Sequence, residues 1–150
     1  MLILRPPRHD EAETLTDLCL RSKAVWGYDE QFMGSCRSEL TLTAGTMRAS
    51  HMRVAELDGC VVGVVQVTVT GELAELDKLF VEPRHLRCGA GRELFDWART
   101  TARVNGAATL TIDADPGAAG FYRRMGAVDD GLAASASIPG RFIPKLRLAL

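Results

Sequence analysis

The middle of the chain is a series of β-branched and apolar runs separated by turn residues, a pattern that predicts antiparallel strands. Met52–Leu57 and Cys60–Thr70 are joined by Asp58-Gly59, a pair that favours tight hairpin turns. Gly71-Glu72 predicts a second tight turn, and Leu73–Val81 follows as a third strand. We therefore expect three consecutive antiparallel strands.

Before these strands, apolar residues recur at helical spacing, which predicts two helices. Asp10 and Glu13 stand in capping-box spacing at the start of the first helix, and Gly27 breaks it after about four turns. Asp29 opens the second helix. The apolar faces comprise Leu15, Leu18, Cys19, Ser22, Val25 and Trp26 in the first helix, and Phe32, Met33, Cys36 and Leu40 in the second.

The segments around these two helices carry weaker signals. Met1–Arg5 is a short apolar run that ends at Pro6-Pro7, so we expect an edge strand, where the missing proline N–H groups matter least. Thr41–Ser50 is polar and mixed, and we expect a loop or a frayed helix end.

After Val81 the pattern changes to strand, turn, helix and strand. Glu82-Pro83 ends the strand, and a glycine turn precedes a helix expected over Arg92–Val104. Thr109–Asp113 is the next strand, and a crossover through a helix makes it parallel to the earlier one. Phe121–Met125 forms a short helix that ends at Gly126, and the tail from Ala127 to Leu150 supplies two more strands.

Composition limits the classes of function. The chain has 150 residues, 47% hydrophobic content and a net charge of −1, which suits a single domain over residues 1–150. Near-neutral charge without a basic run argues against nucleic-acid partners and a membrane-binding helix. No long apolar stretch or signal peptide is present, so we expect a cytoplasmic protein without a membrane partner.

The four cysteines do not indicate a metal site. They are widely spaced, form no CxxC pair and have no histidine cluster nearby, and reduced thiols fit a cytosolic protein. They are Cys19, Cys36, Cys60 and Cys88.

The glycine turn predicts an anion-binding site. Gly89 and Gly91 allow the backbone to approach a ligand, and the free N–H groups of the following helix point towards it. The turn lacks the Gly-Lys-Ser/Thr ending of a P-loop, and dinucleotide-binding spacing would need a small residue at Leu94. A pyrophosphate is the expected ligand.

With its flanks, this stretch resembles the GNAT superfamily of N-acetyltransferases. The acyl-CoA motif of that family, Gln/Arg-x-x-Gly-x-Gly/Ala, aligns with Leu86–Gly91, with both glycines matched and Leu86 departing from the pattern. A second family pattern, Asn-x-x-Ala-x-x-Phe-Tyr-x-x-x-Gly, aligns with Asp115–Gly126, with Asp115 in place of asparagine.

The resemblance implies a fold and a cofactor site. It implies an α/β (α+β) fold with a central mixed, mostly antiparallel sheet, flanking helices and a splayed parallel strand pair that binds acyl-CoA. Acetyl-CoA is the implied cosubstrate. The implied contacts are pyrophosphate at Arg87, Cys88, Gly89, Ala90, Gly91 and Arg92, pantetheine at Leu79, Phe80 and Val81, and Asp115 as a cofactor-side residue or a cap for a short helix starting at Pro116.

Three residues are candidates for proton transfer. Tyr122 matches the tyrosine that many GNAT enzymes use as a general acid on the departing sulfur. Glu75 and Asp77 are expected to share a strand face with Leu79 and Val81, and Glu75 matches the position of the base in some GNAT enzymes. A base or a water relay is useful because an amine of pKa about 10.4 is neutral in only about one molecule in 2,500 at pH 7. The alternatives are a solvated carboxylate pair and a tyrosine that packs on the sulfur.

The acceptor side is less defined. Tyr28 is expected either to contact the substrate or to be a surface turn residue, whereas Trp26 and Phe32 are expected in the core. Arg141 is a candidate for recognising a carboxylate.

Together these features indicate an N-acetyltransferase that moves an acetyl group from acetyl-CoA to an amine of a small molecule or peptide. The alternative is a catalytically silent acyl-CoA-binding sensor. The acceptor, the acyl-chain preference and the oligomeric state are left open, with a homodimer among the alternatives.

Overall fold

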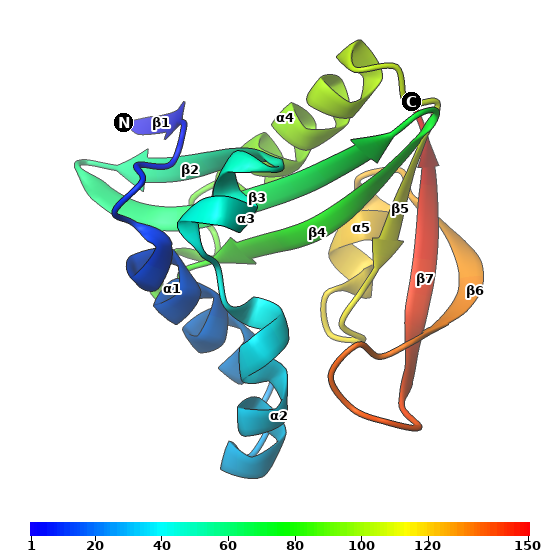
Figure 1. Cartoon of the computed structure of the whole chain (residues 1–150), viewed down its shortest axis with the longest axis horizontal. Helices are drawn as coiled ribbons and strands as arrows, with labels where there is room; N and C mark the ends of the chain where they lie inside the picture. The colour runs from blue at the N-terminus through cyan, green and yellow to red at the C-terminus, as the bar shows by residue number, and fades with distance from the viewer.

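The computed structural model describes residues 1–150 and contains seven strands, five α-helices and one short 3₁₀ turn, Pro83–His85 (Figure 1). The strands are β1 (Leu2–Arg5), β2 (His51–Leu57), β3 (Cys60–Thr70), β4 (Leu73–Val81), β5 (Thr109–Asp113), β6 (Val128–Ala134) and β7 (Phe142–Ala149). The helices are α1 (Ala12–Ala24), α2 (Glu30–Leu40), α3 (Ala44–Arg48), α4 (Ala90–Val104) and α5 (Ala119–Arg124). None of the helices combines the length and apolar character needed to cross a bilayer.

All seven strands form one sheet in the order β1-β2-β3-β4-β5-β7-β6. Only β4 and β5 are parallel, and every other neighbouring pair is antiparallel. The turn between β2 and β3 has Asp58 at φ 50° and Gly59 at φ 85°, the left-handed geometry that hairpins require. The sheet confirms the predicted mixed, mostly antiparallel fold with a parallel pair.

Helices cover both faces of the sheet (Figure 1). The face that α4 covers buries the larger apolar cluster, of 21 residues, in which Phe95 of α4 packs with Val65 and Val67 of β3. The opposite face buries only 10 residues, where Leu15 and Leu18 of α1 meet Val64. The thinner packing on the α1–α2 face leaves room for a cavity.

Several local predictions are corrected by the structure. Glu11 rather than Asp10 precedes α1, and no side-chain cap is formed there, because the Glu11 carboxylate instead binds the Arg5 guanidinium and the Arg8 N–H. Within the expected loop Thr41–Ser50, Thr43 and Thr46 form a capping box that starts the short helix α3.

A β-bulge in β4 changes which side chains share a face. Gln66 pairs with Lys78 whereas Val67 pairs with Leu76, so Asp77 is an extra residue in the ladder. Leu79 and Val81 therefore pack on the α4 face. Asp77 lies on the opposite face, so the expectation that Glu75 and Asp77 share a face with Leu79 and Val81 is wrong.

The parallel pair separates soon after it begins. β4 and β5 are paired only from Leu73–Thr109 to Leu76–Ile112, and beyond Leu76 the edge of β4 that faces β5 has no partner strand. The chain after β5 stays with β7 instead, since the Ala114 N–H donates to the carbonyl of Pro144 in β7. The splayed strand pair predicted from the sequence is confirmed, and it opens a gap in the middle of the sheet.

Candidate active site

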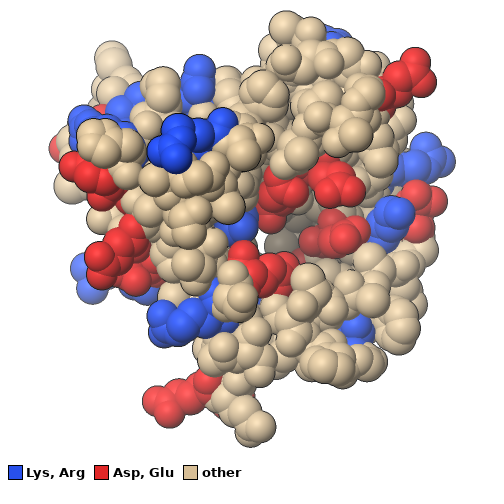
Figure 2. All heavy atoms as spheres, viewed as in Figure 1, with Lys and Arg blue, Asp and Glu red and all other residues tan.

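A cavity of about 360 Å³ occupies the gap between β4 and β5. Its walls come from α1 and α2 on one face, from α5 on the other, and from the segment 135–141 that connects β6 to β7. Figure 2 shows the hollow on the α1–α2 side of the molecule, bordered by both acidic and basic side chains. A ligand in this cavity would contact both halves of the sheet.

The turn before α4 leaves a row of backbone donors free. Gly89 is the N-cap of α4 and adopts φ 88°, the left-handed region that glycine tolerates best. The N–H groups of residues 89–92 have no acceptor, whereas the next one, of Glu93, donates to the Gly89 carbonyl. Free N–H groups at the positive end of a 15-residue helix fit a pyrophosphate.

The cofactor-binding residues predicted from the sequence fall into two groups. Leu79, Phe80, Val81, Gly91 and Asp115 line the cavity. The others lie in the loop and first turn of α4 and do not line it: Arg87, Cys88, Gly89, Ala90 and Arg92. This division suits a ligand whose chain enters the sheet and whose charged end stays on the loop.

Gly91 has no packing reason to be a glycine. A Cβ built on it would lie 3.6 Å from the Phe121 ring and 3.7 Å from Val81 Cγ2, which are ordinary contacts. The missing side chain instead leaves the first turn of α4 open on the side of the cavity.

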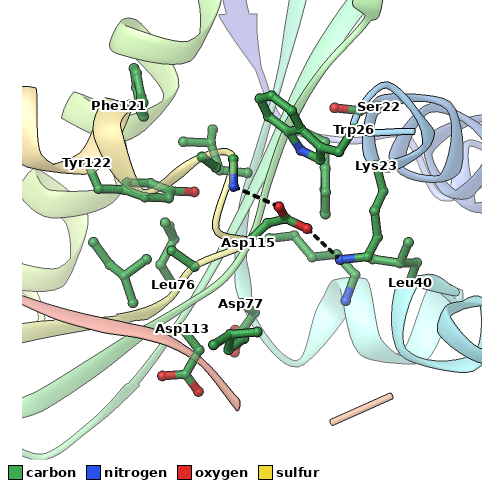
Figure 3. A pocket seen from close by; sticks show the side chains of 18 of the residues that line it. Ser22, Lys23, Trp26, Leu40, Leu76, Asp77, Asp113, Asp115, Phe121 and Tyr122 are labelled. Atoms are coloured by element: carbon green, nitrogen blue, oxygen red, sulfur yellow. Dashed lines mark hydrogen bonds and ion pairs between the residues drawn. The ribbon is translucent and has the colours of Figure 1, made fainter. Parts of the chain in front are cut away.

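Tyr122 is buried, yet its hydroxyl has no partner. The residue is 6% exposed, and its ring packs against Phe95 and Phe121 at centroid distances of 5.7 and 5.3 Å. Figure 3 shows the hydroxyl directed into the cavity. Burial raises the pKa of the phenol, so the proton is held throughout the neutral range. A protonated, unpartnered hydroxyl can donate to a group that enters the cavity.

The two carboxylates predicted on β4 are in different environments. Asp77 lines the cavity and accepts a 2.5 Å hydrogen bond from the Thr68 hydroxyl. Nearby atoms partly desolvate its carboxylate and raise its pKa, although the residue as a whole is exposed. Glu75 is exposed and does not line the cavity.

On the acceptor side, Tyr28 joins α1 and α2 to the rest of the cavity. Its ring stacks on Phe32 at 4.0 Å, and its hydroxyl donates to Asp115 Oδ2 at 2.7 Å. Arg141 Nη2 donates to the same hydroxyl at 2.9 Å, and its guanidinium lies over the Tyr28 and Phe32 rings. Burial, then the hydrogen bond to Asp115, raises the pKa of Tyr28. Tyr28 does not itself line the cavity, but it holds two residues that do, Asp115 and Arg141, so it is not a free surface turn.

Asp115 lines the cavity, but both of its carboxylate oxygens are already held by groups of the protein. Its Oδ2 also lies 3.4 Å from Lys23 Nζ, and its Oδ1 accepts from the Gly117 N–H at 3.0 Å (Figure 3). The short helix begins at Ala119, with Ala118 as its N-cap, so Asp115 organises the preceding turn and does not cap the helix from Pro116.

Some residues of the cavity wall could not be assigned from sequence. Trp26, expected in the core, is 47% exposed and lines the cavity, with its ring so close to Gly117 that a Cβ there would lie 2.7 Å away. Lys23 and Asp113 also line it. The only signal for Asp113 was its place at the end of a strand parallel to β4.

Comparisons with known proteins agree with this geometry. A sequence model of the acetyltransferase (GNAT) family matches residues 15–127. No curated protein sequence matches the chain. Among solved structures, a GCN5-related N-acetyltransferase from Rhodopseudomonas palustris is 23% identical, with a TM-score of 0.82 over 99% of this chain and 95% of that one.

Two further structures share the fold at lower identity. The PaiA N-acetyltransferase from Thermoplasma acidophilum, solved in complex with coenzyme A, is 15% identical, with a TM-score of 0.79 over 100% of this chain and 99% of that one. The ribosomal-protein-S18-alanine N-acetyltransferase from Escherichia coli is 17% identical, with a TM-score of 0.71 over 99% and 94% of the two chains. The splayed strands, the free N–H groups before α4 and the match over residues 15–127 together show that the chain belongs to the GNAT acetyltransferase family.

Proposed function

We propose that the protein is an N-acetyltransferase that transfers the acetyl group of acetyl-CoA to a primary amine of a small molecule or peptide. Membership of the family implies acyl transfer from an acyl-CoA. The observation that carries the finer proposal is the unpartnered hydroxyl of Tyr122, which enters the cavity from the α5 side while Asp77 lines it from the opposite face.

The cosubstrate fits the free groups of the site. The pyrophosphate would accept hydrogen bonds from the N–H groups of residues 89–92, where the α4 dipole favours negative charge. The pantetheine arm would lie in the gap beside Leu79–Val81, where β4 has no partner strand. Its amides could then bond to a strand edge that is otherwise unsatisfied. Arg124 lines the cavity on the α5 side and adds a positive charge.

Transfer requires two proton movements that this site can provide. The amine nitrogen attacks the thioester carbonyl carbon, a C–N bond forms, and the C–S bond breaks. The proton leaving the nitrogen passes to Asp77, directly or through water, and the departing sulfur takes the proton of Tyr122. Asp77 then releases its proton to solvent and Tyr122 regains one from solvent, so a neutral amine and acetyl-CoA yield an amide and free CoA. An amine that arrives protonated releases one further proton to solvent before it attacks.

Asp77 suits the role of base better than Glu75 does. A carboxylate with a raised pKa is a stronger base, and only Asp77 lines the cavity. A base is needed because providing a free amine of pKa about 10.4 at pH 7 costs roughly 4.6 kcal/mol. Glu75 would then have a minor electrostatic effect, since it lies near enough to Asp77 to raise its pKa further.

The test is a thiol-release assay with acetyl-CoA and a panel of polyamines, amino acids, aminoglycosides and peptides, with mass spectrometry of the products. We expect amine-dependent thiol release and a mass gain of one acetyl group. Binding of CoA in calorimetry with no thiol release from any amine would instead favour a silent CoA-binding sensor.

A further inference from the structure

We infer that the acceptor carries a carboxylate as well as its reacting amine, and that Arg141 binds this carboxylate while the amine lies towards Asp77 and Asp113. The inference rests on the proposed function, because it assigns the acceptor end of the same cavity. It places the substrate among amino acids and related zwitterions rather than among polyamines.

Arg141 is held in place without a charged partner. Its guanidinium lies 5.2 Å from the Tyr28 centroid and 4.8 Å from the Phe32 centroid, and these rings stack on each other. One of its five N–H groups donates to the Tyr28 hydroxyl, and no carboxylate of the protein forms an ion pair with it. A part-buried arginine fixed on aromatic faces, with free donors on a cavity wall, fits a planar carboxylate.

A chain of hydrogen bonds fixes the direction of these donors. The Tyr28 hydroxyl gives its proton to Asp115, so it can only accept from Arg141. Asp115 is itself held by Lys23 and by the Gly117 N–H. The protein therefore satisfies Asp115 and Tyr28 internally and leaves the remaining Arg141 donors for a ligand.

Negatively charged side chains lie where β4 and β5 separate. Leu76 and Ile112 are the last paired residues of β4 and β5, so Asp77 and Asp113 are the first residues on the two sides of the gap. Both line the cavity, and neither forms an ion pair with a lysine or arginine. Tyr122 is buried, and its hydroxyl is aimed into the same cavity without a partner, which marks the reacting end of a ligand there (Figure 3).

The charges of the cavity wall favour a zwitterion over a polycation. The formal charges cancel, since Lys23, Lys78, Arg124 and Arg141 face Glu39, Asp77, Asp113 and Asp115. Both signs are visible around the hollow in Figure 2. A polyamine bound at Asp77 and Asp113 would leave the Arg141 charge uncompensated. An amine with a carboxylate would complement both ends.

The test compares acceptors that differ only in the carboxylate. Thiol release from acetyl-CoA is measured with the common L-amino acids, with their carboxamides, and with the corresponding decarboxylated amines such as cadaverine for lysine. We expect at least one amino acid to exceed both its carboxamide and its decarboxylated amine by about tenfold to a hundredfold in kcat/KM, since hydrogen bonds between charged groups are among the strongest.

Variants then assign the preference to Arg141. Arg141→Gln should reduce the ratio of kcat/KM values for the amino acid and its carboxamide to about one, mainly through KM. Arg141→Lys, which keeps the charge and loses the planar fork, should retain part of the preference. Arg147→Gln is the matched control, because Arg147 lies on β7 outside the cavity and forms an ion pair only with Asp130. The preference for the amino acid over its carboxamide should remain in this variant.

The outcomes separate this inference from the proposed function. No binding of acetyl-CoA, or no thiol release with any amine, would contradict the proposed function and the inference together. Thiol release in which carboxamides or polyamines equal or exceed every amino acid would overturn the inference alone. An equal loss for all acceptors in Arg141→Gln would also overturn it and give Arg141 a purely structural role in holding the segment 135–141.

Discussion

Replacing Tyr122 by phenylalanine should make the protein more stable and less active. The residue is buried and its hydroxyl faces the cavity without a hydrogen-bond partner in the protein, so removal of the hydroxyl takes nothing from the fold. An unsatisfied buried polar group costs about 1–3 kcal/mol. Because the Tyr122 hydroxyl faces a cavity that water can enter, we expect a gain below that range, about 0.5–1 kcal/mol. For a chain of this size that corresponds to a rise in Tm of roughly 1–4 °C.

The same change should lower turnover about tenfold to a hundredfold if Tyr122 supplies the proton to the departing sulfur. The loss lies at the lower end for general acids because a thiol of pKa about 8.5 is already a fair leaving group. Burial raises the pKa of Tyr122, so this residue keeps its proton near neutral pH. Its deprotonation should therefore cause no decline of the wild-type rate in that range. CoA affinity should change little.

Tyr28 provides a matched control, because the chain has only two tyrosines and their hydroxyls differ. Tyr28→Phe removes a hydroxyl that donates to Asp115 and accepts from Arg141, so it should lower the unfolding free energy by about 1–2 kcal/mol. Thermal unfolding without ligand and single-turnover kinetics with saturating acetyl-CoA measure both effects. Destabilisation of Tyr122→Phe by 1 kcal/mol or more, or an unchanged rate of the chemical step, would refute the reasoning.

Further substitutions test separate parts of the structure. Gly91→Ala should keep both its Tm and its CoA affinity, because the new Cβ meets only ordinary contacts and the family motif accepts alanine at this position. A bulky side chain there, as in Gly91→Leu, should weaken CoA binding by about tenfold or more in calorimetry; unchanged affinity in that variant would place the pyrophosphate elsewhere. Asp77→Asn should lower kcat/KM at neutral pH, and the activity should recover as the pH rises towards the pKa of the amine. Glu75→Gln lies outside the cavity and should keep the wild-type dependence of kcat/KM on pH. The same pH dependence for both variants would remove Asp77 as the base. Glu11→Gln should lower the unfolding free energy at pH 7 by about 1–3 kcal/mol. Arg5 lowers the pKa of Glu11, so this contribution is complete above the ordinary carboxylate pKa and is lost as the pH falls through the lowered value; a difference that persisted in denaturation at pH about 2 would contradict it.

The parts of the site that local patterns encode were predictable from the sequence. Gly89 and Gly91 stand between a strand and a helix, and Tyr122 lies in a motif whose spacing from them suits a crossover. Each of these features depends on residues within one turn or one element. The structure places these residues on the free N–H loop and in the cavity, although their roles in catalysis and binding remain predictions.

The parts that depend on distant contacts were not predictable. The bulge at Asp77 exists because of how β4 pairs with Gln66 and Val67, and it reverses the face expected for Leu79. The contact between Lys23 and Asp115 joins residues 92 positions apart. Periodicity reports only which face of an element is apolar, so it cannot indicate which polar side chains meet across the fold.

Because β4 pairs with β5 over only a short length, the sheet behaves mechanically as two plates. One plate contains β1 to β4 and the other contains β5, β7 and β6, and only the four residue pairs from Leu73–Thr109 to Leu76–Ile112 connect them as a seam within the sheet. Figure 1 shows the plates diverging from the end of this seam. A cosubstrate between them would act as a brace that restricts their relative rotation, so the angle between the plates and the occupancy of the gap are coupled quantities.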